Sequence, residues 1–160
     1  MNTADIVRTL ETLLTELVDG APKSGGYMLN GGDEGLIRSL EKLSAAEASA
    51  RTRTGSSIAA HTDHVRYGLS LLNRWSDGEE PFGSADWNAS WRRTTVSESE
   101  WRQRIRELRA EAARWQNVIR MPRDVSEIEL TGMVGSIAHL AYHLGAIRQI
   151  SLAALGPKEI

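Results

Sequence analysis

Apolar residues recur at helical spacing in four long segments of the chain, and this repeat limits the possible folds more than any other feature. The first segment covers residues 4–18, with apolar positions at Ile6, Leu10, Leu13, Leu14 and Leu17. Residues three or four apart share one face of a helix. The repeat returns in residues 57–75, 97–120 and 126–155. No stretch alternates apolar and polar residues as a half-buried strand does, so the sequence predicts an all-α fold.

Helix starts are marked by serines. Ser97 with Glu100, and Ser126 with Glu129, have the spacing of a capping box, in which each side chain bonds the backbone N–H of the other residue. Ser57 or the serine before it is a suitable N-cap for the second long helix. The local signals therefore agree with the helical repeat.

The connections between the long segments differ in length. Residues 19–35 are rich in glycine and are expected to form a loop, and a shorter helix is expected over 36–50. Residues 76–95 form a long irregular connection that carries three aromatic residues. We therefore expect a single domain, residues 1–160, folded as a four-helix bundle with a long connection between the second and third long helices.

Composition excludes several classes of function. The chain has 160 residues, a formal charge of -2 and no cysteine, so disulfides, thiolate metal ligands and a cysteine nucleophile are absent. The charge shows no basic excess for nucleic acid, and no apolar run is long enough to span a membrane. The N-terminus carries Asp5 before its apolar residues and lacks the basic region and the cleavage site of a signal peptide, so none is expected. We expect a soluble, cytoplasmic protein.

The four histidines occur as two close pairs, His61 with His64 and His139 with His143. On the last helix both rings project to the face that carries Ile147 and the other apolar residues. On the second long helix, His61 borders the apolar face, whereas His64 projects to the rim. Three imidazoles are therefore expected to point into the bundle.

Inward imidazoles four residues apart can place two nitrogens on one cation, and His61 on a facing helix would supply a third. Three neutral nitrogens leave one coordination position open, as in catalytic sites. Zinc, nickel and iron(II) all suit such ligands. The alternative is a polar cluster of histidines solvated by buried water. A carboxylate-bridged di-iron centre is disfavoured, because no helix carries Glu-x-x-His.

The chain resembles the DinB/YfiT-like metalloenzyme family. The resemblance rests on SIAAHTDHVRYGLSLL, on HLAYHLGAIRQI, and on the length and order of the helices. It implies a four-helix bundle that binds one divalent cation through His61, His139 and His143, and it implies a homodimer. Members with assigned chemistry include transferases and isomerases that use mycothiol or bacillithiol. The mycothiol-dependent maleylpyruvate isomerases carry glutamate at the position of His139.

Other side chains are candidates for a supporting role. Asp63, His64 and Tyr142 lie close in sequence to the expected ligands and could contact them, as could Tyr67. Trp87 and Trp91, which precede Arg92 and Arg93, either wall a pocket for an anionic substrate or thiol cofactor, or hold the long connection on the bundle.

Two functions remain open at this point. The first is a metal-dependent enzyme, a thiol S-transferase or hydrolase acting on a small molecule, since an open zinc site activates water or a thiol. A low-molecular-weight thiol would then be a cosubstrate. The second is a catalytically silent metal-binding bundle that serves as a stress-response or interaction protein. The ligand types do not separate these two functions.

Overall fold

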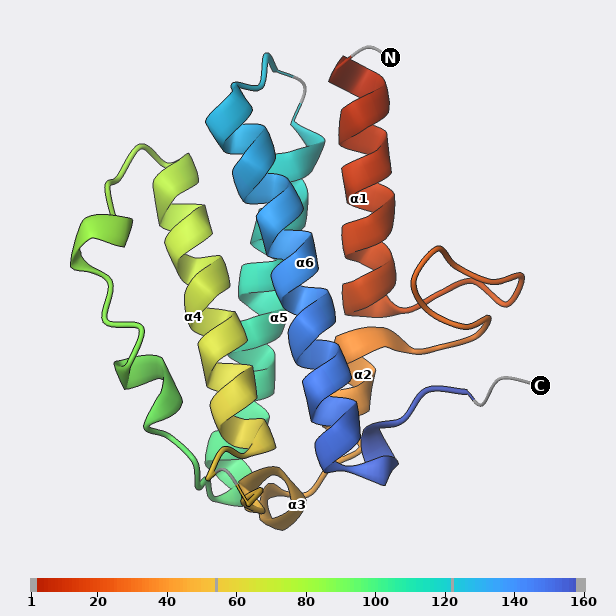
Figure 1. Ribbon diagram of the computed structural model, residues 1–160, viewed down its shortest axis with the longest axis vertical. Coiled ribbons are helices and arrows are strands. Elements are labelled where there is room, and N and C mark those ends of the chain that lie inside the picture. The colour runs from red at the N-terminus through yellow and green to blue at the C-terminus, as the bar shows by residue number, and fades with distance from the viewer. Residues whose placement is uncertain (1–2, 54, 122, 158–160) are drawn as a thin grey trace.

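The computed structural model describes residues 3–53, 55–121 and 123–157, and in this part of the chain the fold is all-α (Figure 1). The α-helices are α1 (Thr3–Asp19), α2 (Gly35–Glu41), α3 (Ala45–Ser49), α4 (Ile58–Ser76), α5 (Glu98–Arg120) and α6 (Glu127–Ile150). Three short 3-10 helices are η1 (Phe82–Ser84), η2 (Ala89–Trp91) and η3 (Leu152–Ala154). No strand occurs in the described residues, which confirms the predicted fold class.

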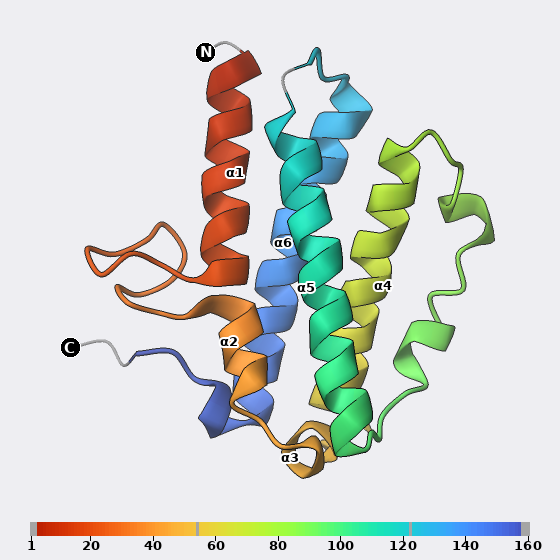
Figure 2. The same ribbon diagram turned by 180° about the vertical axis from the view of Figure 1, so that it is seen from behind.

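The four long helices pack lengthwise into a bundle. Helix α5 contacts α4 and α1, and α6 contacts the same two helices from the other side (Figures 1 and 2). Helices α2 and α3 lie toward one end of the bundle, where α2 contacts α1 and α5. Helices α4 and α6 are therefore neighbours, and the histidine pairs that they carry can meet between them.

Both predicted capping boxes are present. The Ser97 hydroxyl accepts from the backbone N–H of Glu100, and the Glu100 carboxylate accepts from the backbone N–H of Ser97. Ser126 and Glu129 form the same pair at the start of α6. Ser57 is the N-cap of α4, and its hydroxyl accepts from the backbone N–H of Ala60. These bonds satisfy N–H groups that a helix start leaves without a partner, so local chemistry sets these three boundaries.

Two helix boundaries differ from the sequence prediction. The single helix expected over 36–50 is divided into α2 and α3, because Ser44 adopts an extended backbone and starts a third capping box with Glu47. Helix α6 ends at Ile150, about five residues early. Ser151 is extended there, and its hydroxyl accepts from the backbone N–H of Ala153. A serine that bonds the local backbone competes with helix continuation.

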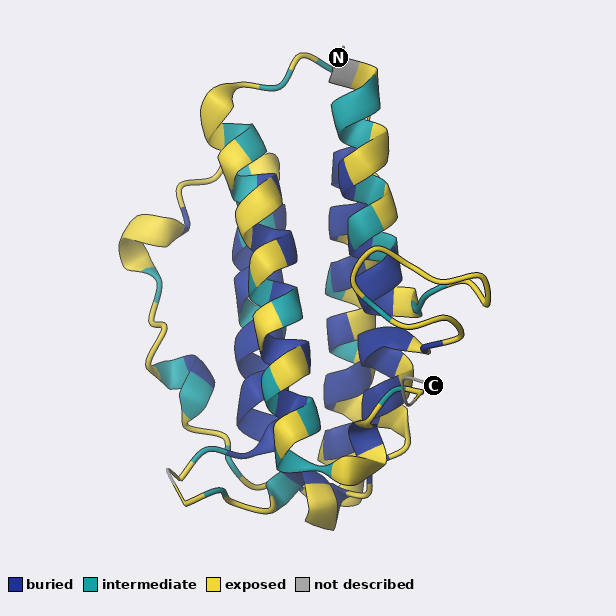
Figure 3. Cartoon of the chain, turned by 45° about the vertical axis from the view of Figure 1, so that its right-hand side comes forward, coloured by how far each residue is buried: buried dark blue, intermediate teal, exposed yellow. Residues whose placement is uncertain are grey.

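One cluster of buried apolar side chains extends from Leu10 on α1 to Ala154 after α6. Figure 3 shows the buried residues on the faces that the long helices turn toward one another. Trp101 and Trp115 are fully buried, and their indole N–H groups donate to the Leu43 carbonyl and the Ser136 hydroxyl, both at 2.9 Å. The polar atom of each large ring is thus satisfied inside the core.

The long connection between α4 and α5 runs along the outside of α4, and η2 packs against that helix (Figure 1). The Tyr67 hydroxyl on α4 accepts from the backbone N–H of Asp86 at 3.1 Å. The connection therefore covers a face of α4 that the helices alone would leave open to water.

Within the described residues, no helix is both long enough and apolar enough to cross a membrane.

Candidate metal centre

The four histidines meet between α4 and α6. His64, His139 and His143 form a cluster in which one ring nitrogen of each residue lies within 4.8 Å of those of the other two. The Nε2 atom of His139 lies 3.1 Å from Nε2 of His64 and 3.0 Å from Nε2 of His143. His64 and His143 are buried, and His139 is partly buried. The structure thus contains a largely buried three-histidine cluster that could hold a metal ion.

Ser90 in η2 fixes which nitrogen of His64 carries the hydrogen. The Ser90 hydroxyl donates to the Trp87 carbonyl at 2.6 Å, and a carbonyl oxygen can only accept. The same Ser90 oxygen lies 2.8 Å from Nδ1 of His64. Because the hydroxyl has one hydrogen and has donated it, Nδ1–H of His64 must donate to Ser90. The Nε2 atom of neutral His64 therefore presents its lone pair to the cluster.

His61 contacts His143 but is not a member of the three-histidine cluster. Its Nδ1 atom is 2.8 Å from Nδ1 of His143, so one of these two atoms donates and the other accepts. When His143 donates, Nε2 of His143 is left with a lone pair that faces His139. His61 then acts on the site by orienting a ring and fixing its tautomer, as the outer partners of metal-binding histidines commonly do.

The two Nε2 separations at His139 are close to those around a tetrahedral cation. Zn–N bonds of about 2.05 Å at tetrahedral angles separate two ligand nitrogens by about 3.3 Å. The observed separations of 3.0 and 3.1 Å are slightly shorter. Neutral imidazoles whose lone pairs face each other at this range repel unless a proton or a cation lies between them. The donor set therefore suits one divalent ion with an open fourth position.

Burial keeps these imidazoles neutral. It lowers the pKa of His143 from 6.5 to about 3, and the neighbouring His139, His61 and His64 add to the shift. Burial also lowers the pKa of His64 to about 4, with His139 and His61 in support and Asp63 opposing. The pKa values of His61 and His139 are lowered by burial as well. A neutral ring is the form that binds metal, so at neutral pH no proton has to be displaced from protonated imidazoles.

Trp91 covers the cluster. Its ring stacks on His64 with a centroid distance of 4.3 Å and an interplanar angle of 26°. It also meets the edge of His61 at 5.1 Å and lies 5.7 Å from His143. The predicted wall residue thus contacts three of the four imidazoles, and it excludes water from one side of the cluster.

His64 differs most from its sequence interpretation. A helical projection placed it at the rim, yet its side chain is only 9% exposed. The reason is the connection after α4: Ser90 and Trp91 lie on the face that carries His64. The structure groups His64, and not His61, with His139 and His143.

The remaining candidates lie around the cluster in different ways. The carboxylate of Asp63 is buried and pairs with Arg104 at 2.7 Å and Arg66 at 3.0 Å, so its contacts are with arginines. Tyr142 is 69% exposed, although its ring meets the edge of His143 at 5.0 Å. Tyr67 holds the connection at Asp86. Trp87 lies 5.6 Å from His64 and lines a cavity beside His139.

Comparison of the chain with family models, with curated proteins and with solved structures finds no match.

Proposed function

We propose that this protein is a metal-dependent enzyme of the DinB/YfiT-like kind, with one divalent cation held by His64, His139 and His143. The observation that carries the proposal is the approach of Nε2 of His64 and Nε2 of His143 to Nε2 of His139, at 3.1 and 3.0 Å. Zinc or nickel is the expected ion, with iron as a further candidate. A cation held by neutral imidazoles supplies Lewis acidity, which ionises water or a thiol near neutral pH.

The chain's own residues prepare the site for this chemistry. Ser90 holds His64 in one tautomer, and His61 holds His143 through Nδ1. Trp91 keeps water from one side of the cluster. Since no carboxylate belongs to the cluster among the described residues, the charge of a divalent ion would stay undiminished, which favours ionisation of a bound nucleophile.

In this proposal the metal ligand from α4 is His64. The resemblance implies His61 as the ligand from that helix instead. The two assignments predict opposite orders of effect. Removal of His64 as a ligand should reduce metal affinity far more than removal of His61 as an orienting partner, which should cost about 10- to 100-fold. Zinc affinities of His64→Ala and His61→Ala, measured by chelator competition, decide between them.

The proposed reaction class is thiol S-transfer or hydrolysis on a small molecule. The test uses protein purified without a histidine tag and loaded with cobalt(II). If a thiol enters the open position, it should add a sulfur-to-cobalt charge-transfer band and shift the visible spectrum. His143→Ala should abolish both metal binding and turnover. A thiol-silent spectrum combined with turnover of ester or amide substrates would favour hydrolysis.

The second candidate is a silent bundle in which metal supports stability alone. The observation that favours it is the burial of the cluster under Trp91. In that case His143→Ala would lower thermal stability and remove the metal, while no substrate in a thiol and hydrolase panel would turn over.

Three further expectations belong to this proposal: a single domain over residues 1–160, a cytoplasmic location, and a homodimer without nucleic-acid or membrane partners. Sedimentation equilibrium tests the dimer, because a monomer of 17.6 kDa and a dimer of twice that mass separate clearly.

A further inference from the structure

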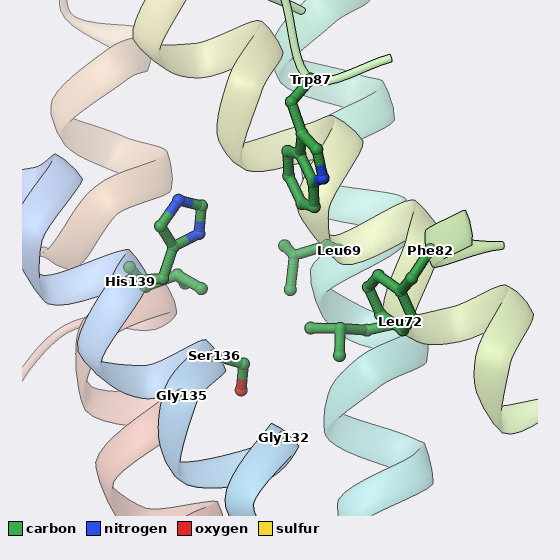
Figure 4. A pocket seen from close by; sticks show the side chains of 10 residues that line it. Leu69, Leu72, Phe82, Trp87, Gly132, Gly135, Ser136 and His139 are labelled. Atoms are coloured by element: carbon green, nitrogen blue, oxygen red, sulfur yellow. The ribbon is translucent and has the colours of Figure 1, made fainter. Parts of the chain in front are cut away.

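A cavity of about 280 Å³ lies next to the histidine cluster, between α4, α6 and the long connection. Figure 4 shows His139 on one side of it, with Leu69 and Trp87 across the gap. Its volume is near the lower end of the range of about 300–1,000 Å³ for small-molecule sites. It therefore suits one ring-sized molecule rather than an extended chain.

The walls of this cavity are almost entirely apolar. Leu69, Leu72 and Leu140 come from the helices, and Phe82 and Trp87 come from the connection. Among the described residues that line it, none is charged. Burying a charged group against such walls would cost several kcal/mol, so the body of the occupant must be uncharged and largely hydrocarbon.

Few polar groups are available to that occupant. The Ser136 hydroxyl also lines the cavity, but it already donates to the Met133 carbonyl at 2.7 Å and accepts from Trp115 at 2.9 Å. The indole N–H of Trp87 and the imidazole of His139 are the other polar groups on the lining side chains. The Nδ1 edge of His139 faces α4, because a Cβ on Gly68 would stand 3.7 Å from Nδ1 and 3.5 Å from Cε1.

The outer nitrogens of the three clustered histidines are used differently. Nδ1 of His64 donates to Ser90, and Nδ1 of His143 pairs with His61. Nδ1 of His139 has no hydrogen-bond partner among the described residues. When Nε2 of a neutral imidazole faces a cation, Nδ1 carries the hydrogen. His139 thus turns an unused N–H donor toward the cavity.

We propose that this cavity is the substrate site, and that its substrate is a small, uncharged, ring-sized hydrocarbon bearing one hydrogen-bond acceptor. This inference rests on the proposed function for its chemistry, because a cation at Nε2 of His139 is what leaves the hydrogen on Nδ1. Nδ1–H of His139 donates to the acceptor, and the leucines with Phe82 and Trp87 enclose the apolar body. Phe82 and Trp87 are 42% and 39% exposed, so the entrance lies along the connection.

The test measures binding of acetophenone, an uncharged aryl ketone, to the full-length protein by ligand-observed NMR, both with one equivalent of zinc and without metal. Burial of a ring-sized apolar group is worth about 10- to 100-fold in affinity, so acetophenone should bind at least tenfold more tightly than acetone. Benzoate, which has the ring and a charge, should bind no better than acetone. In the zinc-loaded protein, where Nδ1 of His139 carries the hydrogen, ethylbenzene, which lacks the acceptor, should bind about 2- to 10-fold more weakly than acetophenone.

Leu72→Trp fills the cavity from a partly buried position, and it should weaken acetophenone binding at least tenfold. Leu13→Trp is the matched control, because Leu13 is also partly buried but lies on α1, away from the cavity; it should bind like the wild type. If Leu72→Trp fails to fold, Phe82→Ala serves instead, since its exposed ring can be removed without disturbing the core. It should weaken binding severalfold.

The inference is overturned if acetophenone, acetone and benzoate bind alike, or if Leu72→Trp or Phe82→Ala binds acetophenone as the wild type does. Neither outcome depends on metal. A protein that takes up no metal would overturn the proposed function, while selective acetophenone binding that Leu72→Trp removes would still support this cavity as a ligand site.

Discussion

Ser90→Ala tests the tautomer argument at its least obvious residue. The substitution removes a hydroxyl that is 6% exposed and makes two hydrogen bonds, one to the Trp87 carbonyl at 2.6 Å and one from Nδ1 of His64 at 2.8 Å. Nδ1–H of His64 then loses its partner inside the protein. An unsatisfied buried group costs about 1–3 kcal/mol, so the metal-free variant should unfold at correspondingly lower denaturant concentration.

Ser90→Ala should reduce metal affinity more than the replacement of a serine that contacts no histidine. With Ser90 absent, His64 is free to flip or to change tautomer, and loss of such an outer partner typically costs 10- to 100-fold in metal affinity. That range equals about 1.4–2.7 kcal/mol. Zinc affinity, measured by competition with a chromophoric chelator, gives this value directly.

Ser70→Ala is the matched control for that experiment. Ser70 also donates to the carbonyl three residues earlier, that of Tyr67 at 2.7 Å, but it has no contact with a histidine. It should lose about 0.5–1.5 kcal/mol of stability or less and keep its zinc affinity. Ser90 does not fix the tautomer of His64 if Ser90→Ala binds zinc within twofold of the wild type, or if Ser70→Ala loses as much affinity.

The other predictions concern charge and packing around the same site. In EDTA the free energy of unfolding should fall as the pH drops from about 6.5 toward 4. The histidines of the unfolded state take up protons near pH 6.5. In the folded state the pKa values of His64 and His143 are lowered to about 4 and about 3, so these residues stay neutral until a lower pH. Each histidine adds at most about 1.4 kcal/mol per pH unit; urea melts of wild type and His143→Ala measure this, and a slope that the variant leaves unchanged would contradict it. Asp63→Ala should destabilise the fold by about 1–3 kcal/mol, because the buried Arg104 guanidinium loses its buried partner and keeps only the more exposed Glu107 at 3.1 Å. Zinc affinity should change less than in Ser90→Ala; loss of metal at full stability would place Asp63 in the site instead. Trp91→Ala should open the cluster to water and speed zinc removal by a chelator in stopped-flow mixing. Trp75→Ala removes a ring that packs on Phe82, away from the histidines, and should leave the rate of zinc removal unchanged. Equal rates for the two variants would show that Trp91 does not shield the cluster from water.

Local sequence chemistry predicted the helices well because the responsible groups are close in sequence. A capping box needs only a serine and a glutamate three residues apart, and the pairs Ser97–Glu100 and Ser126–Glu129 both occur in the structure. The break between α2 and α3 uses the same device at Ser44. It could have been found, because Glu47 stands three residues after Ser44.

The histidine cluster was predicted in part, because a helical projection describes one helix and not what covers it. The projection faced His139 and His143 into the bundle and brought one histidine of α4 near them. It placed His64 at the rim because it could not include η2, which packs on α4 from the other side. The burial of His64 depends on residues more than twenty positions away.

The role of Ser90 and the presence of the cavity could not be predicted from the sequence, for the same reason. A serine between two tryptophans in an irregular connection carries no signal of a bond to His64. The apolar cavity arises where Leu69 and Leu72 of α4 face glycines of α6 across a gap that Trp87 and Phe82 close. Such a space depends on how two helices and a loop are spaced, and helical periodicity does not fix that spacing.

The central claim is that three imidazole nitrogens, from His64, His139 and His143, hold one ion. X-ray absorption at the zinc edge, on tag-free protein carrying one equivalent of zinc, tests it most directly. The account predicts one zinc per chain with three histidine nitrogens at about 2.0–2.1 Å and one further light atom, and a spectrum that His64→Ala changes more than His61→Ala does. An all-oxygen shell, or a three-histidine signature that persists in His64→Ala, would contradict it.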